Sequence, residues 1–293
     1  MRKTVSVAMA LMVLAGTLTA CGSSTAPAAS ANAATTPAAQ TEAGSAAETS
    51  ETANFDATAV KTATGKFTVG FDQEFPPMGF VGDNGEYTGY DLDLAKEVAK
   101  RLNLEFVPQP INWDSKDMEL DAGNIDCIWN GFTMQGREDA YTWVGPYMAN
   151  NQVFVVNEDS DIKKVADLSG KAVEVQKDSS GLAALNDNPE IAGTFGSMTE
   201  VADYNTALMD LESGAADAVC MDSIVAGYQI TKSGKKMRIL DEALAAEEYG
   251  IGFKKDNTAL ADAVKKTLLE MKADGTVKEI SDKWFGSDVF TLE

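Results

Sequence analysis

The sequence contains no histidine among its 293 residues. Histidine is the commonest general base of enzymes and the commonest metal ligand, so its absence removes both candidates. Three cysteines are present, and no pair of them has the spacing of a zinc site. Cys127 and Cys220 lie in apolar, strand-like runs, where a free cysteine usually packs as a small hydrophobic residue. A disulfide between them is the alternative. We therefore expect neither a cofactor nor a metal.

Basic residues are scarce relative to acidic ones, 24 against 45, which gives a formal net charge of −21 at pH 7. Proteins bind the dense negative charge of nucleic acids through lysine and arginine. The composition therefore argues against nucleic acid as a partner. Solubility accounts for the strong acidity as well as any ligand preference does.

Long apolar runs are also rare, and the clearest one extends from Val5 to Leu18, after Arg2 and Lys3. A membrane-spanning helix needs about 20 apolar residues, so this run is too short. A basic start, an apolar middle and small residues before Cys21 are typical of an export signal. We expect residues 1–20 to be removed.

The tetrad Leu18-Thr19-Ala20-Cys21 resembles the lipobox of bacterial lipoproteins, whose cysteine receives a diacylglycerol and becomes the mature N-terminus. The resemblance implies that Cys21 is lipidated. Two acyl chains are enough for stable membrane anchoring, whereas one chain is not. Ordinary secretion is the alternative. Residues 21–64 are rich in Ala, Ser, Thr, Pro and Glu and cannot build a core, so we expect them to form a tether.

The remaining stretch of about 230 residues contains an internal repeat, since 118–128 matches 209–219 at a spacing of 91 residues. In each copy a glycine, Gly123 or Gly214, stands where a helix would end in a left-handed cap, and a strand-like apolar segment follows. The repeat predicts two lobes of similar build. Generic α/β sequence patterning is the alternative explanation of the match.

Elements predicted around the repeats alternate between strand and helix. The sequence predicts strands at 66–71, 152–156 and 172–175, and helices at 92–102 and 259–273. This alternation indicates an α/β fold with largely parallel sheets. In such sheets ligands bind beyond the carboxyl ends of the strands, so polar residues at those ends are the candidate site.

Several segments carry a resemblance to a known family through their order along the chain. They are Val69–Asp72 with Phe75–Pro77, Gly89–Ala95, Gly123–Thr133, Pro146–Tyr147, Asp167–Lys171, Asp217–Ser223 and Gly275–Phe285. In this order they resemble the bacterial extracellular solute-binding proteins for polar amino acids, the receptor components of ABC importers.

The resemblance implies a two-lobed α/β fold of the type II periplasmic-binding-protein kind, with two strands crossing between the lobes. The crossings are expected near 150–154 and 247–253. Lobe 1 would comprise residues 65–150 and 247–293, and lobe 2 would comprise residues 151–246.

A free amino acid carries a carboxylate and an ammonium, and each needs a partner once water is removed. The resemblance assigns the carboxylate to Arg137, whose guanidinium offers two-pronged donation, with the hydroxyl of Thr133 beside it. The family commonly has one more residue between these two than 134–136 supplies, so the loop path differs or the match is shifted. A surface ion pair of Arg137 with Glu138 or Asp139 is the alternative.

The resemblance assigns the ammonium to Asp222 from the other lobe, with capping of the following helix as the alternative. Ser179 and Ser180 match a loop whose backbone N–H groups reach the carboxylate at a helix entrance, which favours anions. Asn130 and Gly131, close to Thr133 in sequence, belong to the same expected ligand site.

The ligand side chain is expected among Asp72, Phe75 and Trp113. Phe75 and Trp113 would enclose apolar or planar groups, and ordinary core packing is their alternative. Asp72 would attract a basic or amide-bearing side chain, although an aspartate at a strand end is also a common turn former. The expected ligand is therefore a polar amino acid, with a cationic one favoured.

The expected function is capture of a free amino acid between the lobes and its delivery, unchanged, to an ABC permease. Ligand contacts with both lobes would favour the closed form. We expect a monomer held by its lipid on the extracytoplasmic face of the membrane. One alternative is a sensory lipoprotein that feeds no transporter. The other is a dehydratase-type enzyme on the same fold, which without histidine would need carboxylates or lysine as acid and base.

Overall fold

The computed structural model describes residue 62 and residues 64–293. The predicted signal peptide, the lipidation site at Cys21 and nearly all of the predicted tether lie outside the described residues. Within the part that the structure describes, every helix is too short or too polar to cross a membrane.

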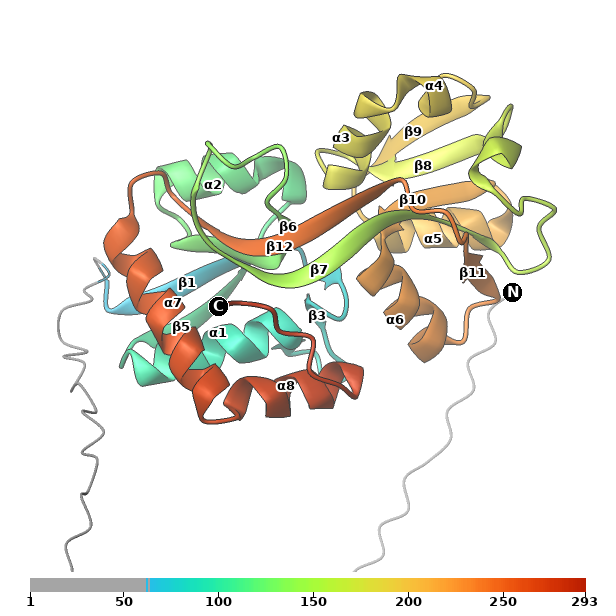
Figure 1. The fold of residues 1–293 in the computed structure, drawn as a ribbon. Helices are drawn as coiled ribbons and strands as arrows, with labels where there is room; N and C mark the ends of the chain where they lie inside the picture. Colours follow the sequence, from blue (N-terminus) through green and yellow to red (C-terminus); the bar gives the residue numbers. More distant parts are fainter. Residues whose placement is uncertain (1–61, 63) are drawn as a thin grey trace, which may run out of the picture. The chain divides into compact units, whose positions relative to one another are not determined.

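The first lobe has a parallel three-stranded core, in which β1 lies between β5 and β6. Three short strands form a small antiparallel sheet beside it, and two helices from the C-terminal part of the chain pack on the same lobe (Figure 1). Its elements are β1 (Lys66–Phe71), β2 (Glu74–Phe75), β3 (Gly79–Val81), β4 (Tyr87–Thr88), α1 (Tyr90–Arg101), β5 (Glu105–Pro110), the 3-10 helix η2 (Trp113–Ser115), α2 (Lys116–Ala122), β6 (Cys127–Thr133), α7 (Thr258–Ala273) and α8 (Thr276–Phe285).

The second lobe repeats the parallel arrangement, with β8 between β10 and β9. Helices α3, α5 and α6 pack against these strands. Its elements are the 3-10 helix η3 (Val165–Leu168), β8 (Ala172–Gln176), α3 (Ser180–Asp187), α4 (Pro189–Ala192), β9 (Ser197–Val201), α5 (Tyr204–Ser213), β10 (Ala218–Asp222), α6 (Ser223–Ser233) and β11 (Met237–Ile239).

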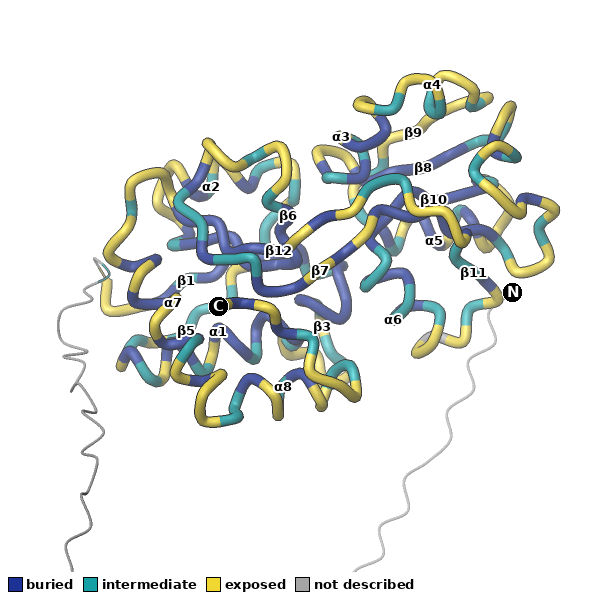
Figure 2. Tube along the Cα trace, in the orientation of Figure 1, coloured by how far each residue is buried: buried dark blue, intermediate teal, exposed yellow. Residues whose placement is uncertain are grey.

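Two long antiparallel strands, β7 (Thr142–Asn157) and β12 (Ala245–Phe253), connect the lobes. They make one continuous mixed sheet in the order β5-β1-β6-β12-β7-β10-β8-β9. The predicted crossings near 150–154 and 247–253 fall within these strands. The predicted parallel pairing holds within each lobe, and the connecting strands add the antiparallel part. Figure 2 shows much of β7 buried along its length.

The internal repeat has the predicted structure in both copies. Helices α2 and α5 end at Gly123 and Gly214, whose φ angles of 75° and 80° are left-handed. Strands β6 and β10 follow, and both are buried throughout. Cys127 and Cys220 lie on these two strands, one in each lobe, and both are free and buried. They therefore pack as small hydrophobic residues and form no disulfide with each other.

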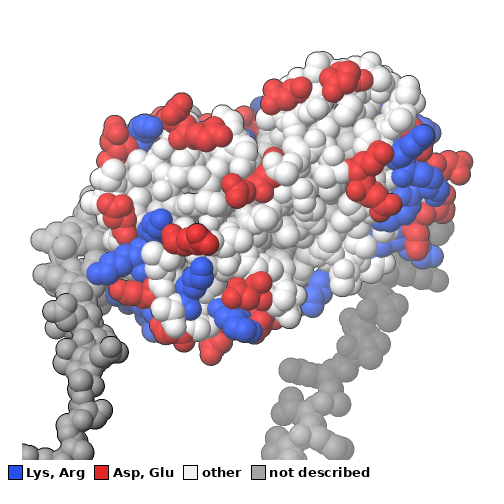
Figure 3. Space-filling model, viewed as in Figure 1, with Lys and Arg blue, Asp and Glu red and all other residues white. Residues whose placement is uncertain are grey.

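Charged side chains on the face shown in Figure 3 are spread over both lobes. Basic groups gather near its right edge, where acidic groups are intermixed with them. Such mixing leaves no continuous basic stripe on this face.

Candidate functional site

Polar residues end the inner strands of both lobes, as the sequence predicts. Thr133 is the last residue of β6 in the first lobe, and Asp222 is the last residue of β10 in the second. Both are nearly inaccessible, at 2% and 3% exposure. The side chain of Asp222 makes no capping hydrogen bond to α6, so capping does not explain why this carboxylate is buried.

The Asp222 carboxylate lies in a pocket of neutral donors. Its Oδ1 accepts hydrogen bonds from Asn150 Nδ2 at 2.7 Å and from the Tyr249 hydroxyl at 2.8 Å. Burial, and second to it the nearby charge of Glu247, raise the pKa of Asp222 to about 7. Among the described residues no lysine or arginine forms an ion pair with Asp222. The site therefore holds buried negative charge that a cation would stabilise.

Glu247 is a second buried carboxylate in the same cluster, and the sequence analysis did not select it. It is 6% exposed and lies on β12, where it pairs with Asn150 of β7. Asn150 Nδ2 lies 3.1 Å from Glu247 Oε2 as well as donating to Asp222. One amide group thus contacts both carboxylates, which places Asp222 and Glu247 in one buried network.

Arg137 is half-buried and contacts the backbone of Thr133, a member of this network. Its guanidinium donates to the backbone oxygens of Thr133 at 3.3 Å and Asp178 at 3.4 Å, and it lies 5.2 Å from the Phe132 ring centre. In the described part of the chain its guanidinium has no ion pair, so the alternative pairing with Glu138 or Asp139 is not seen. Arg137 therefore keeps its charge available for an anion.

The loop between Thr133 and Arg137 is short because it forms a tight turn. The Arg137 N–H donates to the Met134 oxygen at 2.9 Å, and Gly136 adopts a φ of 76°. The turn brings Arg137 back over the end of β6. The hydroxyl of Thr133 donates to Glu247 Oε2 at 2.9 Å. Arg137 and Asp222 are thus connected indirectly, through Thr133, Glu247 and Asn150.

The two serines occupy different positions at the start of α3. Ser179 is the N-cap, and its side chain accepts a hydrogen bond from the Leu182 N–H at 3.1 Å. Ser180 instead turns its hydroxyl into the buried network, 3.1 Å from Gln152 Nε2 and 3.2 Å from the Thr133 hydroxyl. Only Ser180 therefore has its side chain in the cluster.

Asn130 and Gly131 form a tight corner near the end of β6. Gly131 has a φ of 56°, and an added Cβ would lie 3.0 Å from Phe75 Cε1 and 3.1 Å from Tyr249. Its N–H donates to the buried Asp91 at 2.6 Å. Asn130 accepts from the Asp72 N–H at 2.6 Å, and its buried Nδ2 has no partner in the described structure.

Asp72 forms a local turn and also contacts the second lobe. One carboxylate oxygen accepts from the Glu74 N–H at 2.8 Å, which forms a local turn, and the other accepts from Gln176 of the second lobe at 2.7 Å. Burial raises the pKa of Asp72 to about 6, against the lowering effect of these hydrogen bonds. The nearby charge of Asp203 contributes to this rise.

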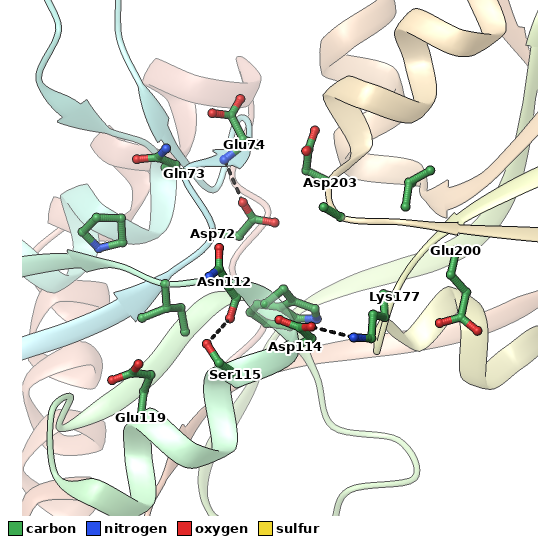
Figure 4. Close-up of a pocket in the computed structure, with 15 residues that line it drawn as sticks. Asp72, Gln73, Glu74, Asn112, Asp114, Ser115, Glu119, Lys177, Glu200 and Asp203 are labelled. Atoms are coloured by element: carbon green, nitrogen blue, oxygen red, sulfur yellow. Dashed lines mark hydrogen bonds and ion pairs between the residues drawn. The ribbon is translucent and has the colours of Figure 1, made fainter. Parts of the chain in front are cut away.

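Asp72 and Trp113 line an open pocket of about 860 Å³ (Figure 4). The pocket is strongly acidic, and its charged lining residues are Asp72, Glu74, Asp114, Glu119, Lys177, Glu200 and Asp203. Figure 4 shows Asp203 facing Asp72 from the second lobe, with the ion pair of Lys177 and Asp114, 2.8 Å long, at one edge. Arg137, Thr133 and Asp222 are absent from its lining and belong to the buried network.

Phe75 and Trp113 have separate partners. Phe75 is buried in the core and packs against Tyr204, with ring centres 5.9 Å apart. Trp113 is half-buried, packs edge-on against Phe132 at 5.5 Å, and carries the Lys116 ammonium 5.3 Å from its ring centre. The structure thus supports core packing for Phe75 and leaves Trp113 on the pocket wall.

The sequence analysis missed Asn150, Gln152 and Tyr249 as well as Glu247. All four lie on the connecting strands, which were predicted as crossings without site residues. Within the described residues, no group of three or more acidic or cysteine side chains is arranged to hold a metal ion.

Two α/β lobes joined by two long strands, with polar groups at the strand ends of both lobes, form the architecture of the type II periplasmic amino-acid-binding proteins. A family model for bacterial extracellular solute-binding proteins, family 3, matches residues 67–287. The chain belongs to this family, as the order of its sequence segments predicted.

Relatives of known role are also solute-binding proteins. The L-cystine-binding protein TcyJ of Escherichia coli strain K12 is 32% identical over 228 residues, which cover 77% of this chain and 84% of the relative. The histidine-binding periplasmic protein of Salmonella typhimurium is 30% identical over 239 residues, which cover 77% of this chain and 89% of the relative.

The solved structures that resemble this chain are also amino-acid-binding proteins. An ABC uptake transporter substrate-binding protein from Streptococcus pneumoniae with bound histidine has a TM-score of 0.75 at 34% identity, covering 78% of this chain and 96% of that one. An ancestral arginine-binding protein bound to arginine has a TM-score of 0.70 at 35% identity, covering 76% and 99% of the two chains.

Proposed function

We propose that this protein captures a free amino acid between its lobes and delivers it, chemically unchanged, to the permease of an ABC importer. The observation that carries the proposal is the buried Asp222 carboxylate, which has no cation partner among the described residues, together with the Arg137 guanidinium, which has no ion pair there. A zwitterion supplies the missing charge at both positions at once. Burying a charge without a partner costs several kcal/mol, so the ligand would relieve a penalty on each side.

In the proposed orientation the ammonium lies at Asp222, and the carboxylate lies at Arg137 with Thr133 and Ser180 nearby. The ligand side chain extends past Trp113 into the pocket at Asp72. Six acidic groups and one lysine line that pocket, which favours a side chain with positive charge or several hydrogen-bond donors. The named relatives bind cystine, histidine and arginine, which are all polar.

A thermal-shift screen of the purified protein against the twenty standard amino acids and L-cystine tests the proposal. We expect one or a few polar amino acids to raise Tm, because a ligand that binds only the folded state stabilises it by mass action. Arg137→Ala should abolish that shift and leave the unliganded Tm almost unchanged. If none of these amino acids changes Tm, the proposed function is wrong.

Transport and catalysis need separate measurements. Reconstituted uptake with a candidate permease distinguishes an importer receptor from a sensory lipoprotein. Incubation with amino acids and prephenate-like acids, followed by product analysis, should return the starting compounds. New product would instead indicate an enzyme.

We also propose that residues 1–20 are a signal peptide, that Cys21 carries the lipid anchor, and that residues 21–64 tether a monomer to the extracytoplasmic face of the membrane. The proposed lobe boundaries are 65–150 with 247–293, and 151–246. Cys21→Ser should release the protein into the medium, since the anchor would be lost. Unchanged membrane retention would contradict the lipidation.

A further inference from the structure

The Oε2 oxygen of Glu247 lies at the meeting point of four donors. The hydroxyls of Thr133 and Ser180 are 2.9 and 3.3 Å from it, and the side-chain amides of Asn150 and Gln152 are 3.1 and 3.0 Å from it. One carboxylate oxygen has two lone pairs, so four donors exceed what it can satisfy at full strength. The cluster is therefore rich in donors for an anion.

These donors come from both lobes and from the strand between them. Thr133 ends β6 in the first lobe, Ser180 begins α3 in the second, and Asn150 and Gln152 lie on β7. Thr133 and Ser180 are also the hydroxyls that the proposed orientation gives to the ligand carboxylate. A carboxylate of the protein itself thus occupies the donors proposed for the carboxylate of the amino acid.

We infer that Glu247 is an internal competitor, which occupies the carboxylate subsite of the empty protein and sets the affinity for the incoming amino acid. The inference rests on the proposed function. Two carboxylates on the same donors would repel each other at short range, so the ligand must displace Glu247. The apparent affinity is then reduced by the fraction of molecules whose subsite is already filled.

An alternative role for Glu247 predicts a different effect of its removal on ligand binding. If Glu247 were a partner of the ligand ammonium, beside Asp222, its removal would weaken every ligand that carries an ammonium. The competitor role instead predicts tighter binding of a ligand that carries only the carboxylate. The two roles can be distinguished by comparing the binding of an amino acid with that of its deaminated acid and its decarboxylated amine.

The experiment uses Glu247→Gln, which removes the charge and keeps the size, in the full mature chain. The matched control is Glu248→Gln, the exposed neighbour on the same strand. Calorimetry compares L-arginine with its deaminated acid, 5-guanidinopentanoate, and its decarboxylated amine, agmatine. The corresponding set for L-histidine is imidazolepropionate and histamine.

For Glu247→Gln we expect the deaminated acid to bind about tenfold tighter than in the wild type, if the filled subsite accounts for roughly nine molecules in ten. Glu248→Gln should match the wild type. Unchanged or weaker binding of the acid overturns the inference, as does a selective loss of the amine. A general loss of packing would not tighten binding of one fragment.

A second measurement needs no ligand. Spin labels at Asp187→Cys and Asp262→Cys, exposed positions on different lobes, report the interlobe distance. In the empty protein Glu247→Ala, which removes the shared oxygen altogether, should lengthen or broaden that distance, because only the 3.2 Å contact between the two hydroxyls would then connect Thr133 to Ser180. An unchanged distribution overturns the inference even if amino acids bind. A wild-type protein that binds no amino acid would instead contradict the proposed function.

Discussion

Replacing Asp222 by asparagine is expected to change stability and binding in opposite directions. The hydrogen bonds that the carboxylate accepts from Asn150 and Tyr249 both end on Oδ1. An asparagine can keep both through its own carbonyl oxygen. The substitution therefore removes a buried charge with little change in packing, and this charge is the one that the ligand ammonium needs.

The size of the stability effect follows from the pKa of Asp222. Its pKa rises from 3.8 to about 7 because burial disfavours the charged form. At about 1.36 kcal/mol per pKa unit, that rise corresponds to roughly 4 kcal/mol of penalty once the group is ionised. Burying the polar amide of asparagine offsets part of this gain, so we expect Asp222→Asn to stabilise the empty protein by about 2 kcal/mol at pH 8. For a chain of this size that is roughly 4–8 °C in Tm.

The stability gained by Asp222→Asn depends on pH. A carboxyl whose folded pKa is raised carries no penalty below its unfolded pKa near 4, and the penalty grows until the pH passes the folded pKa near 7. The gain in Tm from Asp222→Asn should therefore be large at pH 8 and small at pH 5. Binding of an amino acid should weaken by about 100-fold or more, because its ammonium loses a buried partner.

Thermal unfolding at pH 5 and pH 8, without ligand, measures the first effect, and calorimetry with an amino acid and its deaminated acid measures the second. Asp262→Asn, an exposed aspartate on α7, is the matched control and should change neither. A lower Tm for Asp222→Asn at pH 8 would refute the reasoning about buried charge. Equal losses for the amino acid and the deaminated acid would refute the ammonium role.

Three further substitutions address other parts of the site. Arg137→Lys keeps the charge and loses the two-pronged donor, so amino-acid affinity measured by calorimetry should fall at least about tenfold; unchanged affinity would contradict its carboxylate role. Gly131→Ala should lower the unfolding free energy in urea by about 1–3 kcal/mol, because a Cβ at a φ of 56° would lie 3.0 Å from Phe75. An unaffected urea midpoint would mean that this corner can relax. Asp72→Asn should reduce the preference for cationic over neutral amino acids in a competition assay, and an unchanged ranking would exclude Asp72 from side-chain selection.

Local sequence signals predicted much of the fold. The glycines at 123 and 214 marked the ends of two helices because a left-handed cap needs no Cβ. The buried strands that follow end at Thr133 and Asp222, so one repeat led to one candidate residue in each lobe. Strand ends of parallel sheets converge, and this geometry holds for any sequence that forms them.

Residues on the connecting strands could not be selected in the same way. Glu247 and Glu248 are adjacent and chemically identical, yet one is buried and the other is exposed. Successive strand residues face opposite sides, and only the register that pairs Glu247 with Asn150 decides which glutamate turns inward. That register is fixed by pairing over a separation of nearly 100 residues, which a local pattern does not contain.

The raised pKa of Asp222 also makes binding depend on pH. Because the ammonium needs the ionised carboxylate, binding should release a proton wherever Asp222 is protonated in the empty protein, below about pH 7. Affinity should then rise by up to about tenfold per pH unit from pH 5 to 7 and level off above.

Calorimetry at pH 5, 6, 7 and 8, in two buffers of different ionisation enthalpy, measures both the affinity and the released proton. Glu247 belongs to the same buried network as Asp222, and Asp72, with a pKa raised to about 6, adds a second dependence for cationic side chains. Asp222→Asn separates these contributions, because only the part due to Asp222 should disappear. Affinity that stays flat over this range would mean that the ammonium does not meet Asp222. Affinity that rises as the pH falls would mean that the orientation of the zwitterion is reversed.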